Sequence, residues 1–218
     1  MGSEMCIRDR FNLIDMKKDP IKVFGDWALS GRDNQMADGH ADSVNTMIEL
    51  ATNDLENFTF LDVGCGNGWV VRKLINQPEC KYAAGVDGSE YMIAKAKSID
   101  PKGSFFCKDI RQWNPKTTFD VVHSMEVFYY VEQPDVLIQN IFDFWLNLGG
   151  RLIMGIDFYH ENTSCHSWQE ACGVNLMQLF PAKNWIEFFK EAGFKNVNSR
   201  NIGAADNWKG TLVVIGEK

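Results

Sequence analysis

From residue 58 onward, the sequence alternates short apolar runs with longer segments of helical spacing. This alternation is typical of parallel strands joined by crossover helices. The strands expected from the apolar runs are residues 58–63, 82–87, 104–107, 119–123, 151–156, 195–201 and 211–216. The sequence therefore predicts an α/β fold, with a doubly wound, mostly parallel seven-stranded sheet and helices on both faces.

The segments between the strands have the apolar spacing and the flanking signals of helices. These expected helices are residues 69–76, 89–99, 133–147 and 182–192. Two further helices, around 20–29 and 40–52 and separated by the polar stretch 30–39, predict a helical cap over residues 11–57, before a core that spans 58–218. Residues 157–181 interrupt the alternation, as a long functional loop would. Residues 1–10 are charged and aperiodic and are expected to be non-native or disordered.

Composition and charge restrict the class of partner. A chain of 218 residues with 45% hydrophobic and 23% charged residues is expected to fold as one domain. Its net charge of -7 disfavours a nucleic-acid partner and favours a small-molecule one. We expect a cytoplasmic protein without a membrane partner, because no apolar window reaches about 18 residues and no signal-peptide pattern is present. The six cysteines form no CxxC pair and are expected to be reduced.

The strongest motif is a glycine-rich turn, Gly64-Cys65-Gly66-Asn67-Gly68, which follows an apolar strand and opens a helix. Its glycines let the backbone approach a ligand, and the helix N-terminus offers free N–H groups. A dinucleotide fingerprint would place its third glycine where Trp69 stands, which argues against NAD or FAD. No Gly-Lys-Ser/Thr ending follows, as a phosphate-binding P-loop requires. The alternative interpretation is a turn that only packs helix on strand.

In this context, residues 61–68 resemble motif I of the class I, Rossmann-like S-adenosylmethionine-dependent methyltransferases of small-molecule type, and the resemblance extends from about residue 58 to the C-terminus. It implies S-adenosyl-L-methionine as cofactor and S-adenosyl-L-homocysteine as product. It also implies that the turn from Gly64 to Gly68 approaches the methionine part of the cofactor, and that Asp62 receives its ammonium group.

Two acids follow the second and third strands, at positions where the family that the chain resembles also has acids. Asp87, with Gly88 and Ser89 behind it, comes about twenty residues after the turn, where an acid hydrogen-bonds ribose hydroxyls. Capping of the next helix is the alternative role of Asp87, and Met92 is expected either at the adenine or in the core. Asp109 and Ile110 resemble the family position that contacts the adenine amino group.

Asp109 has the alternative role of a helix N-cap or turn residue.

The fourth strand resembles motif IV of the family, whose carboxyl end faces the reactive methyl group. Candidate lining residues there are Ser124, Met125, Phe128, Tyr129 and Tyr130. The family's hydrophobic-histidine pair is missing, so Tyr129 is either a weak base or positioning hydroxyl, or a packed aromatic residue.

Other candidates lie in the long loop and in the cap. His160 and His166 are candidate general bases, with Glu161 as an orienting carboxylate, unless this loop is simply solvated. A zinc site made of His160, Cys165, His166 and Cys172 matches no common spacing, so we predict no metal. In the cap, Arg32 is a candidate partner of the methionine carboxylate, and His40 is a candidate for facing the acceptor. The alternative roles are a solvated charge for Arg32 and a helix N-terminal residue for His40.

The sequence thus predicts transfer of a methyl group to O, N or S of a small-molecule acceptor by in-line displacement. Orientation and desolvation would supply most of the catalysis, because the leaving group is already cationic. The alternatives are a non-catalytic S-adenosylmethionine-binding or partner-binding protein of the same fold, and an NAD(P)-dependent oxidoreductase.

Overall fold

The computed structural model of the protein describes residues 17–218, apart from the side chains of residues 34–37. The expectation for residues 1–10 and the first part of the predicted cap, 11–16, lie outside the described residues. No helix in the described part is long and apolar enough to cross a membrane. The five described cysteines, Cys65, Cys80, Cys107, Cys165 and Cys172, are free thiols.

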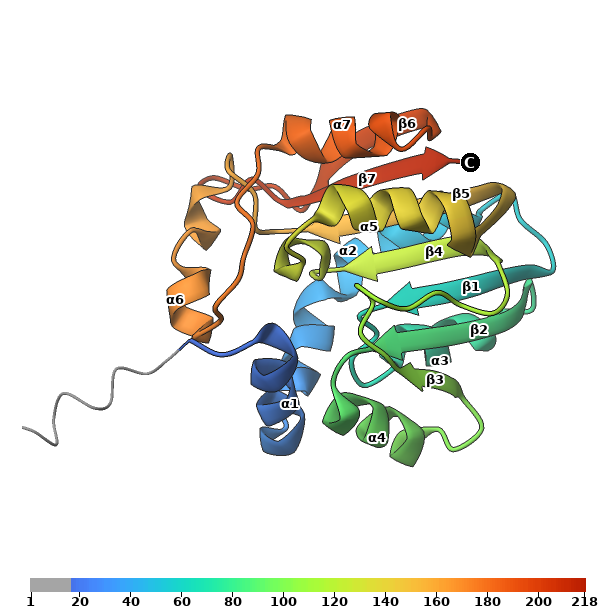
Figure 1. Ribbon diagram of the computed structural model, residues 1–218, viewed down its shortest axis with the longest axis horizontal. Helices are drawn as coiled ribbons and strands as arrows, with labels where there is room; N and C mark the ends of the chain where they lie inside the picture. Colours follow the sequence, from blue (N-terminus) through green and yellow to red (C-terminus); the bar gives the residue numbers. More distant parts are fainter. Residues whose placement is uncertain (1–16) are drawn as a thin grey trace, which may run out of the picture.

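A single seven-stranded sheet forms the centre of the molecule (Figure 1). Its strands are β1 (Phe58–Val63), β2 (Cys80–Asp87), β3 (Ser104–Cys107), β4 (Phe119–Met125), β5 (Leu146–Ile156), β6 (Lys195–Ile202) and β7 (Thr211–Glu217). In space they follow the order β3-β2-β1-β4-β5-β7-β6. The first five strands pair in parallel, and β7 pairs antiparallel with both β5 and β6. The predicted fold class is confirmed.

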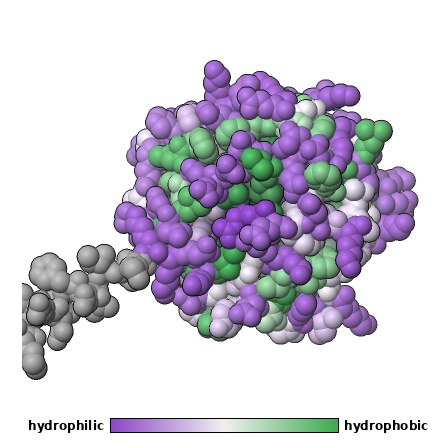
Figure 2. All heavy atoms as spheres, viewed as in Figure 1, coloured by the Kyte–Doolittle hydropathy of each residue, from purple (hydrophilic) through white to green (hydrophobic). Residues whose placement is uncertain are grey.

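The helices lie on both faces of this sheet (Figure 1). They are α1 (Pro20–Ser30), α2 (Asp33–Thr52), α3 (Trp69–Ile75), α4 (Glu90–Ile99), α5 (Pro134–Asn140), α6 (Trp168–Cys172) and α7 (Ala182–Glu191). Short turns of other helix types are η1 (Phe128–Tyr130), η2 (Ile141–Trp145) and η3 (Thr163–Cys165). Figure 2 shows hydrophilic side chains over most of the viewed face, with apolar ones exposed in small groups.

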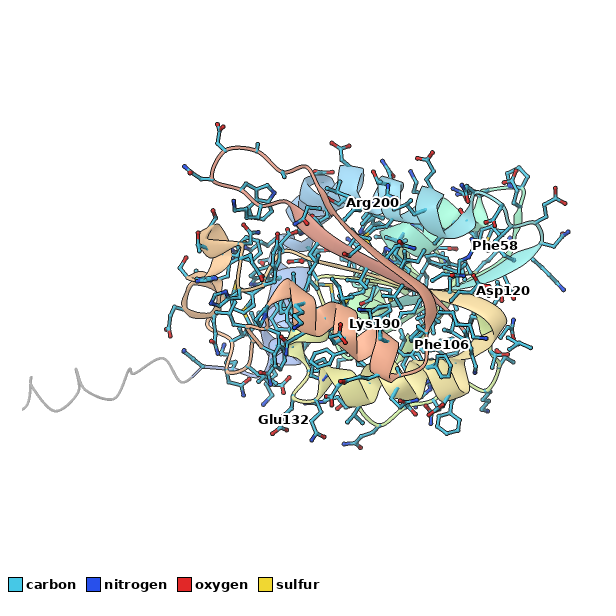
Figure 3. The ribbon with its side chains drawn as sticks, turned by 90° about the horizontal axis from the view of Figure 1, so that it is seen from above. Phe58, Phe106, Asp120, Glu132, Lys190 and Arg200 are labelled. Atoms are coloured by element: carbon cyan, nitrogen blue, oxygen red, sulfur yellow. The ribbon has the colours of Figure 1, made fainter. Side chains whose placement is uncertain are left out.

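Each face of the sheet has its own apolar core. On one face, Ile138 of α5 and Trp185 of α7 pack with strand residues such as Val122. On the other face, Met47 of α2 and Val70 of α3 pack with a second set of strand residues. Burial of each such side chain contributes about 1.5–3 kcal/mol. At the sheet edge formed by β6, Lys190 of α7 and Arg200 of β6 stay exposed (Figure 3).

Two helix boundaries differ from the sequence prediction by about two turns. Helix α2 begins at Asp33, within the polar stretch that was expected to separate two helices. Gly31 in the left-handed conformation (φ 77°) ends α1, and partners from distant segments hold Asp33, so tertiary contacts override the polar composition. The helix expected over 133–147 ends at Asn140, and a π-turn with Ile141 and Trp145 buried leads directly into β5 at Leu146.

The late segment 157–181 is held to the core by buried polar side chains. Asn162 donates to the carbonyl oxygen of Asp157 (2.9 Å) and accepts from the backbone N–H of Lys209 (3.1 Å). The hydroxyl of Tyr159, which is almost fully buried, donates to the carbonyl oxygen of Gly210 (3.1 Å). These bonds fix the direction in which the segment leaves β5.

Replacing Gly68 with alanine tests the packing of α3 on the sheet. Gly68 has φ 78°, and an added Cβ would lie 2.4 Å from Cε1 of Phe105. Left-handed strain and overpacking together are expected to lower the free energy of unfolding by about 2–5 kcal/mol in urea titrations. Gly39→Ala is the control, because nothing lies within 4 Å of its added Cβ in α2. That change is expected to be neutral or stabilising by up to about 1 kcal/mol, and equal losses in both variants would contradict the packing argument.

Candidate active site

Two adjoining cavities lie where the parallel strands β1, β2 and β4 end. The larger encloses about 840 Å³ including its open mouth, and the smaller about 550 Å³. Their shared lining residues are Gly64, Gly66, Met92, Met125 and Glu126. The carboxyl edge of an open α/β sheet is where such folds bind their ligands.

The glycine-rich turn separates the two cavities. Gly64 has φ 74°, and an added Cβ would lie 2.1 Å from Cγ2 of Val127, so no other residue fits there without displacing the end of β4. Gly66 has φ 51°, and the nearest atom to its added Cβ is Sδ of Met92 at 3.9 Å. At Gly64 the glycine serves packing, whereas at Gly66 it keeps the backbone open toward the cavities.

Asp87 ends β2 at the wall of the larger cavity. One carboxylate oxygen accepts from the backbone N–H of Ser89 (2.8 Å) and the other from that of Gly66 (3.0 Å). Burial raises the pKa of Asp87. Each oxygen keeps a lone pair for a further donor, so this carboxyl is placed to accept hydroxyl groups of a bound nucleoside.

The remaining wall of the larger cavity comes from three other elements. Asp109 lines it beside Ile110, and Arg111 donates to both oxygens of Asp109, which lowers the pKa of that carboxyl. Phe24 of α1 and Tyr130 of η1 add apolar surface, with their ring centroids 5.1 Å apart. The cavity is therefore mostly apolar with a few convergent polar groups, which is typical of a cofactor site.

The smaller cavity contains two buried polar pairs. Oδ1 of Asp62 lies 2.7 Å from Nδ1 of His123. Asp33 at the start of α2 accepts from Nδ2 of Asn67 (2.9 Å) and pairs with Lys95 of α4 (2.7 Å). These contacts join α2, the glycine-rich turn and α4.

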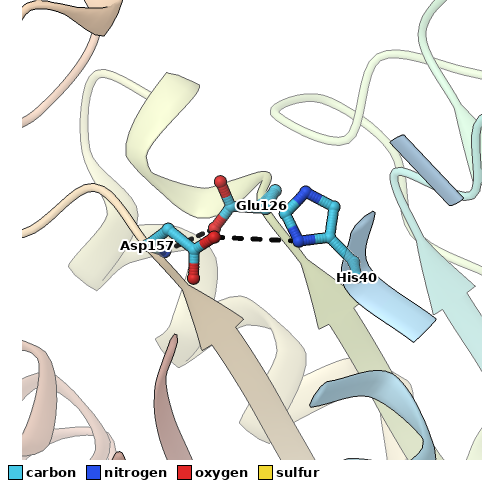
Figure 4. A group of neighbouring side chains, drawn as sticks. All are labelled: His40, Glu126 and Asp157. Carbon is cyan, nitrogen blue, oxygen red and sulfur yellow. Dashed lines mark hydrogen bonds and ion pairs between the residues drawn. The ribbon is translucent and has the colours of Figure 1, made fainter. Parts of the chain in front are cut away.

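A cluster of His40, Glu126 and Asp157 lies where β4 and β5 end beneath α2 (Figure 4). Nδ1 of His40 is 3.7 Å from Oδ2 of Asp157. Glu126 accepts from the backbone N–H of Asp157 and, at 2.7 Å, from the hydroxyl of Tyr129. Among residues 17–218, these three form the only group of potential metal ligands whose atoms lie within 4.8 Å of one another.

Burial controls the protonation of this cluster. It raises the pKa of Asp157, and it raises that of Glu126 well above its ordinary value. It lowers the pKa of His40, with the charge of Asp157 opposing the shift. Glu126 also holds a positive φ of 61°, a strained conformation that persists only where surrounding contacts enforce it.

The structure brings part of the predicted set to the cavities. Predicted residues that line one or both are His40, Asp62, Gly64, Cys65, Gly66, Asn67, Asp87, Gly88, Met92, Asp109, Ile110, Met125 and Tyr130. Cys65 is buried, which raises the pKa of its thiol well above the ordinary value and leaves it unreactive. Ser89 caps α4 by accepting from the backbone N–H of Met92, beside the cavity rather than in it.

Other predicted residues lie outside both linings. Arg32 is exposed, with its guanidinium 4.0 Å from the centroid of the Trp27 ring, and Ser124 donates to the carbonyl oxygen of Val63 inside the sheet. Gly68 packs on Phe105. A direct role in binding therefore has no geometric support at these three positions.

The same holds for His160 and His166, which are exposed and line neither cavity. Nε2 of His166 lies 3.0 Å from the carbonyl oxygen of His160. Tyr129 is buried, lines neither cavity and donates its hydroxyl to Glu126. Sequence reasoning missed Glu126, Asp157 and His123; the signal available for the first two was a carboxylate directly after a buried strand.

A Rossmann-like sheet with a glycine-rich turn and an acid at the end of β2 defines a nucleoside-binding α/β protein. A family model of the methyltransferase domain matches residues 32–199. The chain therefore belongs to the methyltransferase domain family, which confirms the resemblance to class I S-adenosylmethionine-dependent methyltransferases and with it the predicted cofactor.

Similar proteins differ in what they act on. The chain is 32% identical to malonyl-[acyl-carrier protein] O-methyltransferase of Bacillus anthracis over 161 residues, 69% of this chain and 60% of that protein. It is 26% identical to tRNA U34 carboxymethyltransferase of Actinobacillus pleuropneumoniae over 158 residues, 66% of this chain and 47% of that protein. The chain thus spans about half the length of the tRNA U34 carboxymethyltransferases it matches.

Solved structures share the fold over most of the chain. A chain from the complex between the Haloferax volcanii Trm112 methyltransferase activator and a methyltransferase superposes with a TM-score of 0.76 at 26% identity, covering 89% of this chain and 96% of that one. N-methyltransferase NodS from Bradyrhizobium japonicum, in complex with S-adenosyl-L-homocysteine, superposes with a TM-score of 0.64 at 22% identity, covering 80% and 84%. The similarity to NodS, at 22% identity, supports the fold alone.

The residues of the two cavities fit S-adenosylmethionine. Gly66 leaves open space for a ligand, and the carboxyl of Asp87 faces the larger cavity with lone pairs to spare. The smaller cavity continues from the larger one past the same turn, and it offers polar groups for a charged end.

Asp87→Ala is expected to weaken binding of S-adenosyl-L-homocysteine in isothermal titration calorimetry. Losing hydrogen bonds to a charged acceptor costs about 1.5–3 kcal/mol, which corresponds to roughly 10- to 150-fold in Kd. Asp135→Ala, an exposed acid of α5, is the matched control and is expected to bind as the wild type does. Unchanged affinity in Asp87→Ala would remove this carboxyl from the cofactor site.

Proposed function

We propose that the protein transfers a methyl group from S-adenosylmethionine to O, N or S of a small-molecule acceptor. The observation that carries this proposal is the pairing of His40, which lines the smaller cavity, with Asp157 beside Glu126, which lines both cavities. S-adenosylmethionine, when bound, supplies an electrophilic methyl group on a sulfonium. The residues of the chain have to bind, orient and, for a hydroxyl acceptor, deprotonate.

His40 is the proposed general base. Burial lowers its pKa, so the imidazole is neutral and able to accept a proton near neutral pH. Asp157 faces Nδ1, and the other ring nitrogen points away from Asp157 (Figure 4). An acid on Nδ1 favours the tautomer in which Nε2 carries the free lone pair. The separation of 3.7 Å is longer than a hydrogen bond, as is common for catalytic pairs before substrate binds.

Orientation and exclusion of water would supply the larger share of catalysis. The rings of Phe24 and Tyr130 line the larger cavity, and α2 lies over the smaller one through Asp33 and His40. The net charge of -7 favours a small acceptor over a polyanion such as tRNA. One relative is named a malonyl-[acyl-carrier protein] O-methyltransferase. An acceptor attached to a carrier protein is therefore tested as well as free small molecules.

The acceptor experiment measures release of S-adenosyl-L-homocysteine with panels of small carboxylic acids, phenols, amines and thiols, and separately with tRNA and acyl-carrier protein. We expect turnover with a small molecule. Turnover with tRNA or carrier protein alone would overturn the small-molecule proposal, and tight cofactor binding without any turnover would favour the non-catalytic alternative. Binding of NADH in place of S-adenosyl-L-homocysteine, followed by fluorescence, would favour the oxidoreductase.

His40→Gln separates the base from the binding site. If the acceptor is a hydroxyl, the variant is expected to lose about 100- to 10,000-fold in kcat, the usual contribution of general-base catalysis. Its Kd for S-adenosyl-L-homocysteine is expected to stay within about twofold, because His40 does not line the larger cavity, where Asp87 is placed to hold the nucleoside. Equal losses in kcat and in cofactor affinity would assign His40 to cofactor binding instead.

The protonation of His40 has a testable sign. Because burial lowers its pKa, its imidazole is expected to titrate below the ordinary value of 6.5 in histidine-labelled NMR spectra. Asp157→Asn should move that midpoint lower still, since the charge of Asp157 raises the pKa of His40. The chain has four histidines, so His40→Gln identifies the resonance. A midpoint at or above 6.5 would contradict the assignment of a neutral buried base.

A further inference from the structure

One buried histidine has no role in the scheme above. His123 of β4 is fully buried, its ring stacks on Phe60 with centroids 5.7 Å apart, and its Nδ1 contacts Oδ1 of Asp62 at 2.7 Å. Its Nε2 has no hydrogen-bond partner within the part of the chain that the structure describes. Buried polar atoms are nearly always hydrogen-bonded, so an unpartnered one calls for a ligand, a water or a functional explanation.

The position of His123 points to a ligand. Asp62 and His123 are register partners on adjacent parallel strands, near the carboxyl ends of both, and both line the smaller cavity. That cavity meets the larger one at Gly64 and Gly66. A ligand whose nucleoside lies at Asp87 therefore reaches His123 with its other end.

The chemistry of the pair selects the ligand group. In the tautomer whose ring proton lies on Nδ1, where it is donated to the carboxyl group of Asp62, Nε2 has a free lone pair and is an acceptor. Of the other acids of this cavity, Asp33 is already held by Asn67 and Lys95. The pair of Asp62 and His123 thus presents a negative carboxylate and a free lone pair, which together favour a cationic N–H donor.

We infer that Nε2 of His123 accepts a hydrogen bond from the α-ammonium group of the methionine portion of the cofactor. Asp62 is then a positioning residue as well as a counter-charge, because its Oδ1 is committed to His123. This inference rests on S-adenosylmethionine as the cofactor. It adds a residue of β4 to the binding site, whereas the motif alone assigns the ammonium group to Asp62.

A pair of matched variants tests it. The side-chain amide of His123→Asn takes the place of Nδ1 and retains the bond to Asp62, but it has no atom at the place of Nε2. His123→Gln carries a polar atom at the place of Nε2. Three probes are titrated by calorimetry: S-adenosyl-L-homocysteine, its analogue without the α-amino group, and 5′-methylthioadenosine, which lacks the amino-acid end altogether.

We expect His123→Asn to weaken binding of S-adenosyl-L-homocysteine by about tenfold or more, while 5′-methylthioadenosine binds as it does to the wild type. The variant should also lose the preference of the wild type for S-adenosyl-L-homocysteine over the deamino analogue, and His123→Gln should recover part of it. Unchanged binding of 5′-methylthioadenosine also shows that the variant is folded.

Equal weakening for all three probes would reduce His123 to a packing role and overturn the inference. The inference would also be overturned if His123→Asn kept the preference of the wild type for S-adenosyl-L-homocysteine over the deamino analogue. If the wild type binds neither S-adenosyl-L-homocysteine nor 5′-methylthioadenosine, the cofactor itself is wrong. If it binds both and the variants show no difference between probes, only the role of His123 fails.

Discussion

The contact between the glycine-rich turn and the end of β4 determines the geometry of the whole site. A side chain at Gly64 would overlap Val127, because an added Cβ would lie 2.1 Å from Cγ2 of that residue. The N–H groups of Gly64 and Cys65 both donate to the carbonyl oxygen of Val86, so the same turn is tied to β2. Three strand ends are thereby fixed relative to one another, and the two cavities are the space left above them.

Around this fixed turn, the site gathers carboxyl groups at a cost in stability. Burial raises the pKa values of Asp87, Glu126 and Asp157, so ionising any of them works against folding. Backbone N–H groups offset part of that cost, since each of Asp87 and Glu126 accepts at least one. Perturbed acids held in this way concentrate at functional sites, because a well-solvated carboxylate would be more stable but less useful.

The sequence predicted the features that are local. Strands β1 and β3 match the expected residue ranges, and the glycine-rich turn and Asp87 could be placed because strand, turn and acid follow at short spacings. Residues placed by contacts between distant segments could not be predicted. The roles of His123 and Asp157 depend on which strand lies beside β1 and on where segment 157–181 turns. Arg32 was a candidate for the methionine carboxylate, whereas its guanidinium lies over the ring of Trp27.

Helix α2 links the site to the apolar core, because one part of it lines the smaller cavity and another part packs on the sheet. Its C-terminal half buries Val44, Met47 and Ala51 against the sheet, while Asp33 and His40, about two turns apart, face the smaller cavity. Asp33 holds the glycine-rich turn through Asn67, and His40 meets Asp157 at the end of β5. A base carried on such a helix is held by packing, so its distance from the cofactor turn is set by the same core that stabilises the fold.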